Sequence, residues 1–161
     1  STNFSMRNFE NGGDDFIERL QYTLQRYGID PCYIEIEVTE SVIVEKLDSL
    51  KACLTRLGKL GYRIAIDDFG TGYSSLSVLL EIPANVVKID KSFTDKIHQN
   101  GQSAFVYQMG QFIQSAKEEV IFEGIEEEQQ RTFLMECGFN YGQGYYFDRP
   151  LPLEEFEKKY I

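Results

Sequence analysis

The chain alternates short runs rich in β-branched residues with longer runs in which apolar residues recur every three or four positions. The short runs predict buried strands, and the longer runs predict helices with one apolar face. The predicted strands cover residues 34–38, 63–67, 86–89, 119–123 and 141–147. The predicted helices cover residues 15–27, 47–60, 74–80, 105–116 and 129–137. Strands that alternate with helices in this way indicate an α/β fold built on a parallel sheet.

The start of the first predicted helix carries two local signals. Asp14 or Asp15 is placed to cap its first turn. The segment Gly12-Gly13-Asp14-Asp15-Phe16 also resembles the Gly-Gly-Asp-Glu-Phe hairpin of diguanylate cyclases. That hairpin lies between two strands, whereas this segment precedes an amphipathic helix. We therefore interpret it as a turn followed by a helix cap.

Chain length bears on the architecture but leaves two alternatives open. A doubly wound sheet and a (β/α) barrel both produce alternating strands and helices. A whole barrel usually needs about 250 residues, and this chain has 161. An incomplete barrel is therefore compatible with the length.

The charge of the chain limits the classes of binding partner, and its cysteine content bears on the cellular compartment. The chain has 26 Asp and Glu against 16 Lys and Arg, a formal net charge of −10, so it lacks the basic surface that binds a DNA or RNA polymer. An acidic chain can still bind a phosphodiester through divalent cations. Three scattered cysteines without a C-x-x-C pair fit a reducing compartment, and no apolar run suits a membrane segment. We expect a cytoplasmic chain, although a parent protein could be anchored in a membrane.

Charged residues recur where the predicted strands end. Glu37, Asp67, Lys88 and Glu123 each lie at or near the carboxyl end of a strand. In a barrel these ends converge on the face that carries the active site. The adjacent carboxylates of Asp67 and Asp68 could each contact a hard cation such as Mg²⁺ or Mn²⁺. Taken alone, the pair is equally compatible with a solvated loop, but four charged strand ends in register favour a functional site.

Six segments together resemble one family, the EAL-domain phosphodiesterases that cleave cyclic di-GMP. They match, in order, the family patterns N-x-S, E-x-T-E-S, D-D-F-G-T-G-Y-S-S-L, K-I-D-x-S-F, E-G-V-E and Q-G-Y followed by proline. The corresponding segments are Asn3-Phe4-Ser5, Glu37-Val38-Thr39-Glu40-Ser41, 67–76, Lys88-Ile89-Asp90-Lys91-Ser92-Phe93, Glu123-Gly124-Ile125-Glu126, and Gln143-Gly144-Tyr145 with Pro150. The resemblance spans essentially the whole chain and implies a modified TIM barrel that converts cyclic di-GMP to linear pGpG.

The resemblance also implies a role for each matched residue. Two metal ions, Mg²⁺ or Mn²⁺, would be bound through Asn3, Glu37, Asp67, Asp68 and Glu123, with Asp67 as the bridging ligand. Lys88 would hold the attacking water, and Glu123 is also the candidate general base. Glu40 would brace the loop that follows Asp67 and Asp68. Asp90 and Gln143 would lie at the substrate.

One departure from the family concerns the start of the barrel. The Glu-Ala-Leu segment that names the family, whose glutamate is a metal ligand, does not occur in this sequence. We therefore expect residues 1–161 to form a single EAL-type domain without its first βα units, which favours inactivity of this polypeptide by itself. The parent would carry a sensory or GGDEF domain, and the resemblance allows a homodimer. The alternative function is a catalytically inactive cyclic di-GMP receptor or a protein-interaction module.

Overall fold

Within the residues that the computed structural model describes, one parallel sheet organises the chain; these residues are 1–4, 13–45, 47–71, 76–99, 101–117 and 119–161. The sheet has six strands, which neighbour one another in the same order as they occur in the chain. The strands are β1 (Thr2–Asn3), β2 (Glu35–Thr39), β3 (Arg63–Phe69), β4 (Val86–Ile89), β5 (Glu119–Phe122) and β6 (Tyr141–Gly142).

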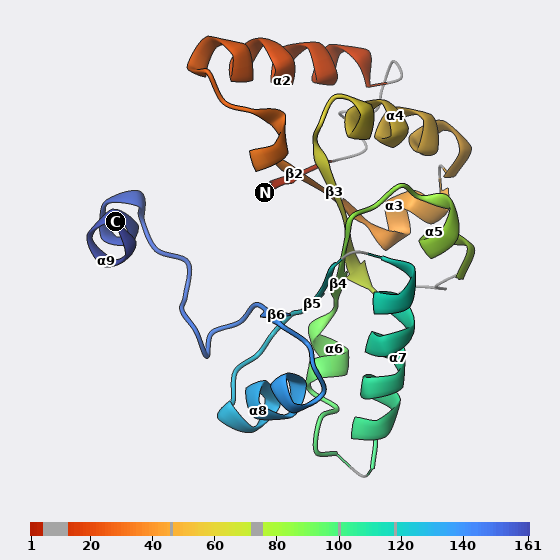
Figure 1. The fold of residues 1–161 in the computed structure, drawn as a ribbon, viewed down its shortest axis with the longest axis vertical. Coiled ribbons are helices and arrows are strands. Elements are labelled where there is room, and N and C mark those ends of the chain that lie inside the picture. Colours follow the sequence, from red (N-terminus) through yellow and green to blue (C-terminus); the bar gives the residue numbers. More distant parts are fainter. Residues whose placement is uncertain (5–12, 46, 72–75, 100, 118) are drawn as a thin grey trace.

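The strand order decides between the two architectures that the alternating pattern allows. In a doubly wound sheet the order of the strands reverses at a switch point, whereas in a barrel each strand is added on the same side of the previous one. The order β1-β2-β3-β4-β5-β6 contains no reversal. In Figure 1 helices α4, α5 and α7 lie along one side of this sheet. The arrangement is that of part of a (β/α) barrel.

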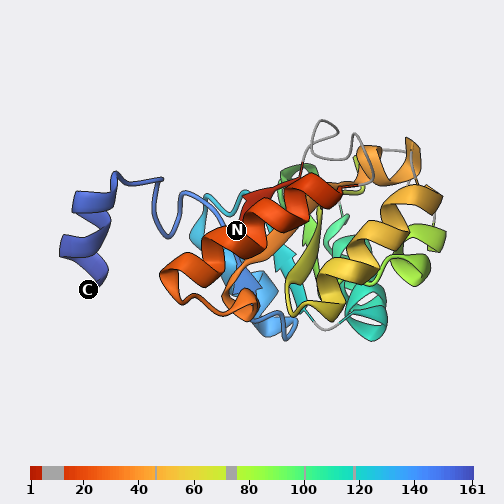
Figure 2. The same ribbon diagram turned by 90° about the horizontal axis from the view of Figure 1, so that it is seen from above.

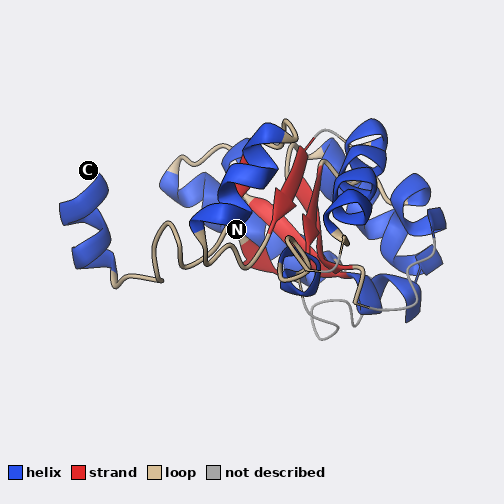
Figure 3. Cartoon of the chain, turned by 90° about the horizontal axis from the view of Figure 1, so that it is seen from below, coloured by secondary structure: helices blue, strands red, loops and turns tan. Residues whose placement is uncertain are grey.

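Helices connect the strands and surround the sheet (Figure 3). The helices are α2 (Asp14–Tyr27), α3 (Glu40–Glu45), α4 (Leu47–Lys59), α5 (Leu76–Glu81), α6 (Lys91–Thr94), α7 (Ser103–Ala116), α8 (Glu128–Glu136) and α9 (Leu153–Tyr160), with a short 3₁₀ turn at Pro31–Tyr33. Helix α9 projects away from the other elements in Figures 1 and 2, and none of its residues is buried. Among the described residues, no helix combines the length and the apolar character that a membrane-spanning segment needs.

The core lies between the strands and the helices that cover them. All four residues of β4 are buried, as are Ile64 and Ile66 of β3. Helix α4 contributes Leu50, Leu54 and Leu57, which are completely buried and recur at the spacing of one helix face. Because β4 and the first part of β3 are buried, they appear in the sequence as mainly apolar runs, whereas β2 alternates polar and apolar residues.

The structure differs from the sequence-based expectation at both ends of the chain. The residue that caps α2 is Gly13, with φ 77 and no side-chain hydrogen bond, so the prediction of an aspartate cap is wrong. Asp14 instead forms an ion pair with Arg56 of α4. The fifth predicted strand stops at Gly142, because the chain then wraps around Ile125, whose backbone N–H donates to the Gln143 carbonyl (3.0 Å).

Very short helices cannot be predicted from the period of apolar residues. Helix α6 has four residues and α3 has six, so neither contains enough turns to show a repeating apolar face. The helix expected at 74–80 is present as α5 from Leu76, and residues 74 and 75 lie outside the described part. Ser5 of the first motif and Gly12 of the Gly-Gly-Asp segment lie outside it as well.

Candidate functional site

The carboxyl ends of the central strands bring one lysine and three carboxylates together. The ammonium nitrogen of Lys88 lies 3.1 Å from Glu37 Oε1, 3.1 Å from Asp67 Oδ1 and 2.8 Å from Glu123 Oε1. Lys88 and Glu37 are buried, with 6% and 7% of their surfaces exposed. These four residues come from β2, β3, β4 and the residue after β5, so the parallel register places their side chains at one edge of the sheet.

A local distortion of β3 turns two adjacent carboxylates toward this site. Neighbouring side chains of a regular strand point to opposite faces. The pairing of β3 with β4 shifts register between Ile66 and Phe69, and Asp68 has φ 54, which is a left-handed conformation. As a result, one carboxylate oxygen from each of Asp67, Asp68 and Glu123 lies within 4.8 Å of the other two.

The site carries more negative charge than its one ammonium group balances. Burial raises the pKa of the Asp68 carboxyl, and the charges of Asp67 and Asp90 raise that pKa further. Burial also raises the pKa of Glu123, and the hydrogen bond and charge of Lys88 offset this effect only in part. Burial alone would lower the pKa of Lys88, but the surrounding carboxylates, Glu123 first, outweigh it and raise that pKa.

These residues fit a divalent cation. Mg²⁺ and Mn²⁺ are hard cations that take carboxylate oxygens as ligands. Asp67, Asp68 and Glu123 offer such oxygens at mutually close positions, each from a half-buried side chain. A bound cation would also stabilise the charged forms of Asp68 and Glu123, whose pKa values are raised first by burial and then by the neighbouring carboxylates. Among the described residues, no other group of three or more potential ligands lies as close together.

Glu40 connects the end of β2 with the loop after β3. Its side chain is buried, and Oε2 accepts a hydrogen bond from the backbone N–H of Gly70 (2.9 Å). On the same loop the Thr71 hydroxyl donates to the Asp68 carbonyl (2.9 Å). Residues 72–75, which complete the predicted glycine-rich loop, lie outside the described part. The described contacts link Glu40 to the segment that carries Asp67 and Asp68.

Three other predicted site residues lie around this cluster. Asn3 pairs with Glu37 across β1 and β2, and its side chain is exposed. Asp90 caps α6 by accepting a hydrogen bond from the Ser92 N–H (2.9 Å). Gln143 is exposed and lines a groove of about 390 Å³ that also contains Glu123. The structure therefore places these residues next to the cluster, on three separate strand ends.

The groove beside Glu123 includes a residue that sequence reasoning missed. Lys91, the first residue of α6, forms an ion pair there with Glu126. A lone exposed lysine carries no sequence signal. The glycine directly after Glu123 could have indicated a close contact, because glycine allows close approach of the backbone, and the structure gives Gly124 a φ of 68.

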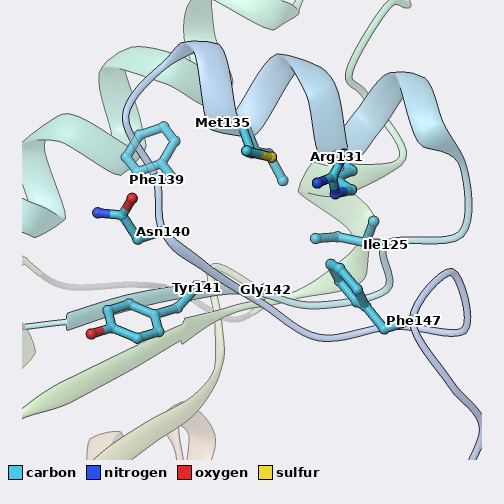
Figure 4. A pocket seen from close by; sticks show the side chains of 9 residues that line it. Ile125, Arg131, Met135, Phe139, Asn140, Tyr141, Gly142 and Phe147 are labelled. Carbon is cyan, nitrogen blue, oxygen red and sulfur yellow. The ribbon is translucent and has the colours of Figure 1, made fainter.

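A second cavity lies between α8 and β6, as Figure 4 shows. It has a volume of about 250 Å³ and is lined largely by apolar and aromatic side chains, among them Leu134, Phe139 and Phe147. Arg131 is the charged residue in its lining, and none of the lining residues carries a carboxylate. This cavity is therefore unsuited to a hard cation and is separate from the candidate metal site.

The sequence profile of the EAL domain family matches residues 1–150. The chain belongs to the EAL domain family. This result confirms the family indicated by the six motifs, and it agrees with the sheet topology of an incomplete TIM barrel.

Two relatives of known sequence support this assignment. The chain is 42% identical over 97% of its length to signaling protein YkoW of Bacillus subtilis, and 37% identical over 92% to cyclic di-GMP phosphodiesterase NbdA of Pseudomonas aeruginosa. It spans only 19% and 20% of these two proteins, about a fifth of their lengths.

Two solved structures show the same fold. The structure of EAL enzyme Bd1971 with cAMP and cyclic di-GMP bound has a TM-score of 0.90 at 34% identity, and the match covers 99% of this chain and 42% of that one. The manganese and cyclic di-GMP complex of Klebsiella pneumoniae BlrP1 has a TM-score of 0.78 at 31% identity, covering 85% of this chain and 35% of that one.

Proposed function

We propose that this domain hydrolyses cyclic di-GMP to linear pGpG with the help of divalent metal ions. The observation that carries the proposal is the cluster of Asp67, Asp68 and Glu123, whose oxygens lie within 4.8 Å of one another, with Lys88 beside them. The name of NbdA and the cyclic di-GMP bound to Bd1971 support the choice of substrate. The acidic chain would bind this anionic substrate through its metal ions.

The proposed ligand set divides the strand ends between two metal ions. Asn3, Glu37 and Asp67 would bind one ion, and Asp67, Asp68 and Glu123 would bind the other. We infer Mg²⁺ or Mn²⁺, and the manganese complex of BlrP1 supports a divalent metal in this fold. When bound, two such ions would supply Lewis-acid stabilisation of the attacking and leaving oxygens.

The residues of the chain would direct the proton and the substrate. The water oxygen forms a bond to phosphorus while the bond from phosphorus to the ribose 3′ oxygen breaks. Lys88 would orient that water, and Glu123 is the candidate base for its proton, which finally resides on the leaving oxygen. Gln143 and Asp90 would contact the substrate beside Glu123, with Gln143 in the adjacent groove.

The larger setting of the domain is also a proposal. Because the chain spans about a fifth of YkoW and NbdA, we infer that it works within a longer protein that carries a sensory or GGDEF domain. A homodimer would be one assembly of that protein. The three cysteines lie in the chain as free thiols, which fits a cytoplasmic location.

The test compares two glutamates of the same strand in the natural full-length protein. Glu37→Ala removes a residue 3.1 Å from Lys88, whereas Glu35→Ala removes a carboxylate that faces Arg63 at 3.8 Å. Each protein is incubated with cyclic di-GMP and Mn²⁺, and the nucleotides are separated by chromatography. We expect linear pGpG from wild type and Glu35→Ala and no product from Glu37→Ala.

Other outcomes would redirect the proposal. Full activity of Glu37→Ala would contradict the site assignment. Tight binding of cyclic di-GMP by the wild-type protein without hydrolysis would indicate a receptor. Absence of both nucleotide and metal binding would indicate a protein-interaction module.

A further inference from the structure

Helix α6 lies between two turns that carry candidate metal ligands. It directly follows β4 and Asp90, so it starts three residues after Lys88 (Figure 1). On one side, the last residues of β3 include Asp68 and lead into the turn at Gly70, and on the other side the turn after β5 contains Glu123 and Gly124. Both glycines have left-handed backbones, with φ 99 at Gly70 and φ 68 at Gly124.

The backbone of Gly70 lies directly against the ring of Phe93. A Cβ atom on Gly70 would lie 2.3 Å from Phe93 Cε2 and 2.7 Å from Cζ. Phe93 itself is buried, with 9% of its surface exposed. Gly70 is also the residue whose N–H donates to Glu40. The turn at Gly70, two residues after Asp68, is thus held between an aromatic ring and a carboxylate.

The backbone of Gly124 lies equally close to the stem of Lys91. A Cβ atom on Gly124 would lie 2.3 Å from Lys91 Cγ and 2.7 Å from Cδ. The Lys91 ammonium then reaches past the glycine to pair with Glu126. The aliphatic stem therefore spans the turn from Gly124 to Glu126, immediately after Glu123.

Helix α6 is itself well anchored. Asp90 caps it through the Ser92 N–H, and the Thr94 carbonyl accepts a hydrogen bond from Gln130 Nε2 of α8 (3.3 Å). The Glu123 N–H donates to the carbonyl of Ile89 at the end of β4 (3.0 Å). Contacts made by α6 can therefore fix the turns on either side of it.

We propose that Lys91 and Phe93 are positioning residues that hold the Glu123 and Asp68 turns at the distance the metal site requires. The assignment of a metal site rests on the proposed function, and the inference adds the residues that shape it. Phe93 acts through Gly70, and Lys91 acts through Gly124. Neither side chain needs to contact a metal ion or the substrate.

The stem of Lys91 matters more than its charge in this arrangement. The ion pair with Glu126 is exposed, with 43% and 46% of the two side chains accessible, and exposed pairs contribute little. Packing against the Gly124 backbone is short-range and depends on Cβ, Cγ and Cδ of Lys91, and Met keeps the first two and has sulfur in place of the third. Lys91→Met retains that packing, whereas Lys91→Ala removes it.

The experiment measures Mn²⁺ affinity by calorimetry, thermal unfolding, and the kinetic constants for cyclic di-GMP in the natural full-length protein. The variants are Lys91→Ala, Lys91→Met, Phe93→Ala and Phe93→Leu. Lys51→Ala is the matched control, because Lys51 also forms an exposed ion pair, with Glu81 at 3.3 Å, and has a similar exposed fraction of 45%. The control deletes the same atoms away from the metal site.

We expect Lys91→Ala and Phe93→Ala to weaken Mn²⁺ binding and lower kcat by roughly tenfold, the usual effect of losing support around a ligand. Lys91→Met and Phe93→Leu should retain most of the wild-type Mn²⁺ affinity and kcat, and Lys51→Ala should match wild type in both. A purely structural role would lower the unfolding temperature of the alanine variants without changing the Mn²⁺ affinity of the folded protein, and that result would overturn the inference.

Three further outcomes are decisive. If Lys91→Met raises KM as much as Lys91→Ala while Mn²⁺ affinity stays unchanged, the ammonium contacts substrate and the positioning role is wrong. If the wild-type protein binds Mn²⁺ but does not cleave cyclic di-GMP, the proposed function fails while the Mn²⁺ titration of the variants still decides the inference. A wild-type protein that binds no Mn²⁺ would overturn both.

Discussion

The ammonium group of Lys88 on β4 lies 2.8 Å from Oε1 of Glu123, which is in the turn after the neighbouring strand β5. The strand register pairs Lys88 with Ile121, so Glu123 lies two residues further along the chain, directly after β5, and its side chain reaches back to the lysine. The same ammonium also contacts Glu37 and Asp67. One positive charge therefore organises three carboxylates and partly balances them before a metal ion binds.

Replacing Lys88 would separate its stabilising role from its proposed catalytic role. In Lys88→Met the three carboxylates lose their shared partner, so without metal the free energy of unfolding should fall by about 3 kcal/mol. Turnover should fall by about a hundredfold or more. Mn²⁺ should raise the unfolding temperature more in this variant than in wild type, because the site is more negative. Thermal unfolding with EDTA and with Mn²⁺ measures this difference, and equal Mn²⁺ effects would contradict the charge balance.

Substitutions of Glu40 that remove its hydrogen bond to Gly70 should reduce stability and turnover more than a substitution that keeps this bond. Glu40→Ala leaves the Gly70 N–H without its 2.9 Å acceptor, which should cost about 1–3 kcal/mol of unfolding free energy and reduce turnover. Glu40→Gln keeps an acceptor oxygen and should lose less. Urea unfolding and product formation provide the measurements, and Glu45→Ala, at an exposed position of the same helix, is the control. Identical results for Glu40→Ala and Glu45→Ala would refute the bracing role.

Two helical glycines should respond in opposite directions to the same substitution. A Cβ atom on Gly110 of α7 would lie 2.4 Å from Phe139 Cζ and 2.9 Å from Phe122 Cζ, so Gly110→Ala should destabilise the protein by about 1–3 kcal/mol. Gly58 of α4 has no atom within 4 Å of that position, so Gly58→Ala should stabilise by up to about 1 kcal/mol through helix propensity. Urea unfolding compares the two, and stabilisation by both substitutions would show that α7 packs less closely than described.

Metal removal should abolish turnover and lower stability together. EDTA should stop formation of linear pGpG, and excess Mn²⁺ or Mg²⁺ should restore it. Because a ligand stabilises only the state that binds it, Mn²⁺ at about a hundred times its Kd should add about 2.7 kcal/mol to the unfolding free energy. Chromatography and thermal unfolding follow the two effects. Persistent turnover in EDTA would exclude the proposed metal chemistry.

The accuracy with which the sequence predicted strand positions differed between strands. The run at 86–89 coincides with β4, because a strand buried on both sides is mainly apolar, and the single charged residue in it is Lys88. The run at 141–147 was overestimated, because its alternation of aromatic residues and glycines resembles a strand. The contact of Gly144 with the backbone of Ile125 ends that strand early, since a Cβ on Gly144 would lie 2.0 Å from the Ile125 carbonyl oxygen. Periodicity carries no information about such a contact.

The candidate site was predictable in kind but not in shape. Glu37, Asp67, Lys88 and Glu123 stand at strand ends in the sequence, and parallel strands bring such ends to one edge. The sequence does not show that Asp68 adopts φ 54 and turns its carboxylate to the same side as that of Asp67. It also does not show that Lys91 packs on Gly124, because Lys91 follows β4 whereas Gly124 follows β5, and the two residues are distant in the sequence.

The sequence alone determined the order of strands and helices, the types of residue at the strand ends and the family to which the chain belongs. These properties follow from local patterns, since the period of apolar residues and the motifs are read along a single segment. The tertiary structure alone decided the strand order without reversal, the register shift at Asp67 and Asp68, and the close contacts of α6 with Gly70 and Gly124. These features depend on packing between segments that are distant in the sequence, where distances of a few ångströms decide which side chains meet.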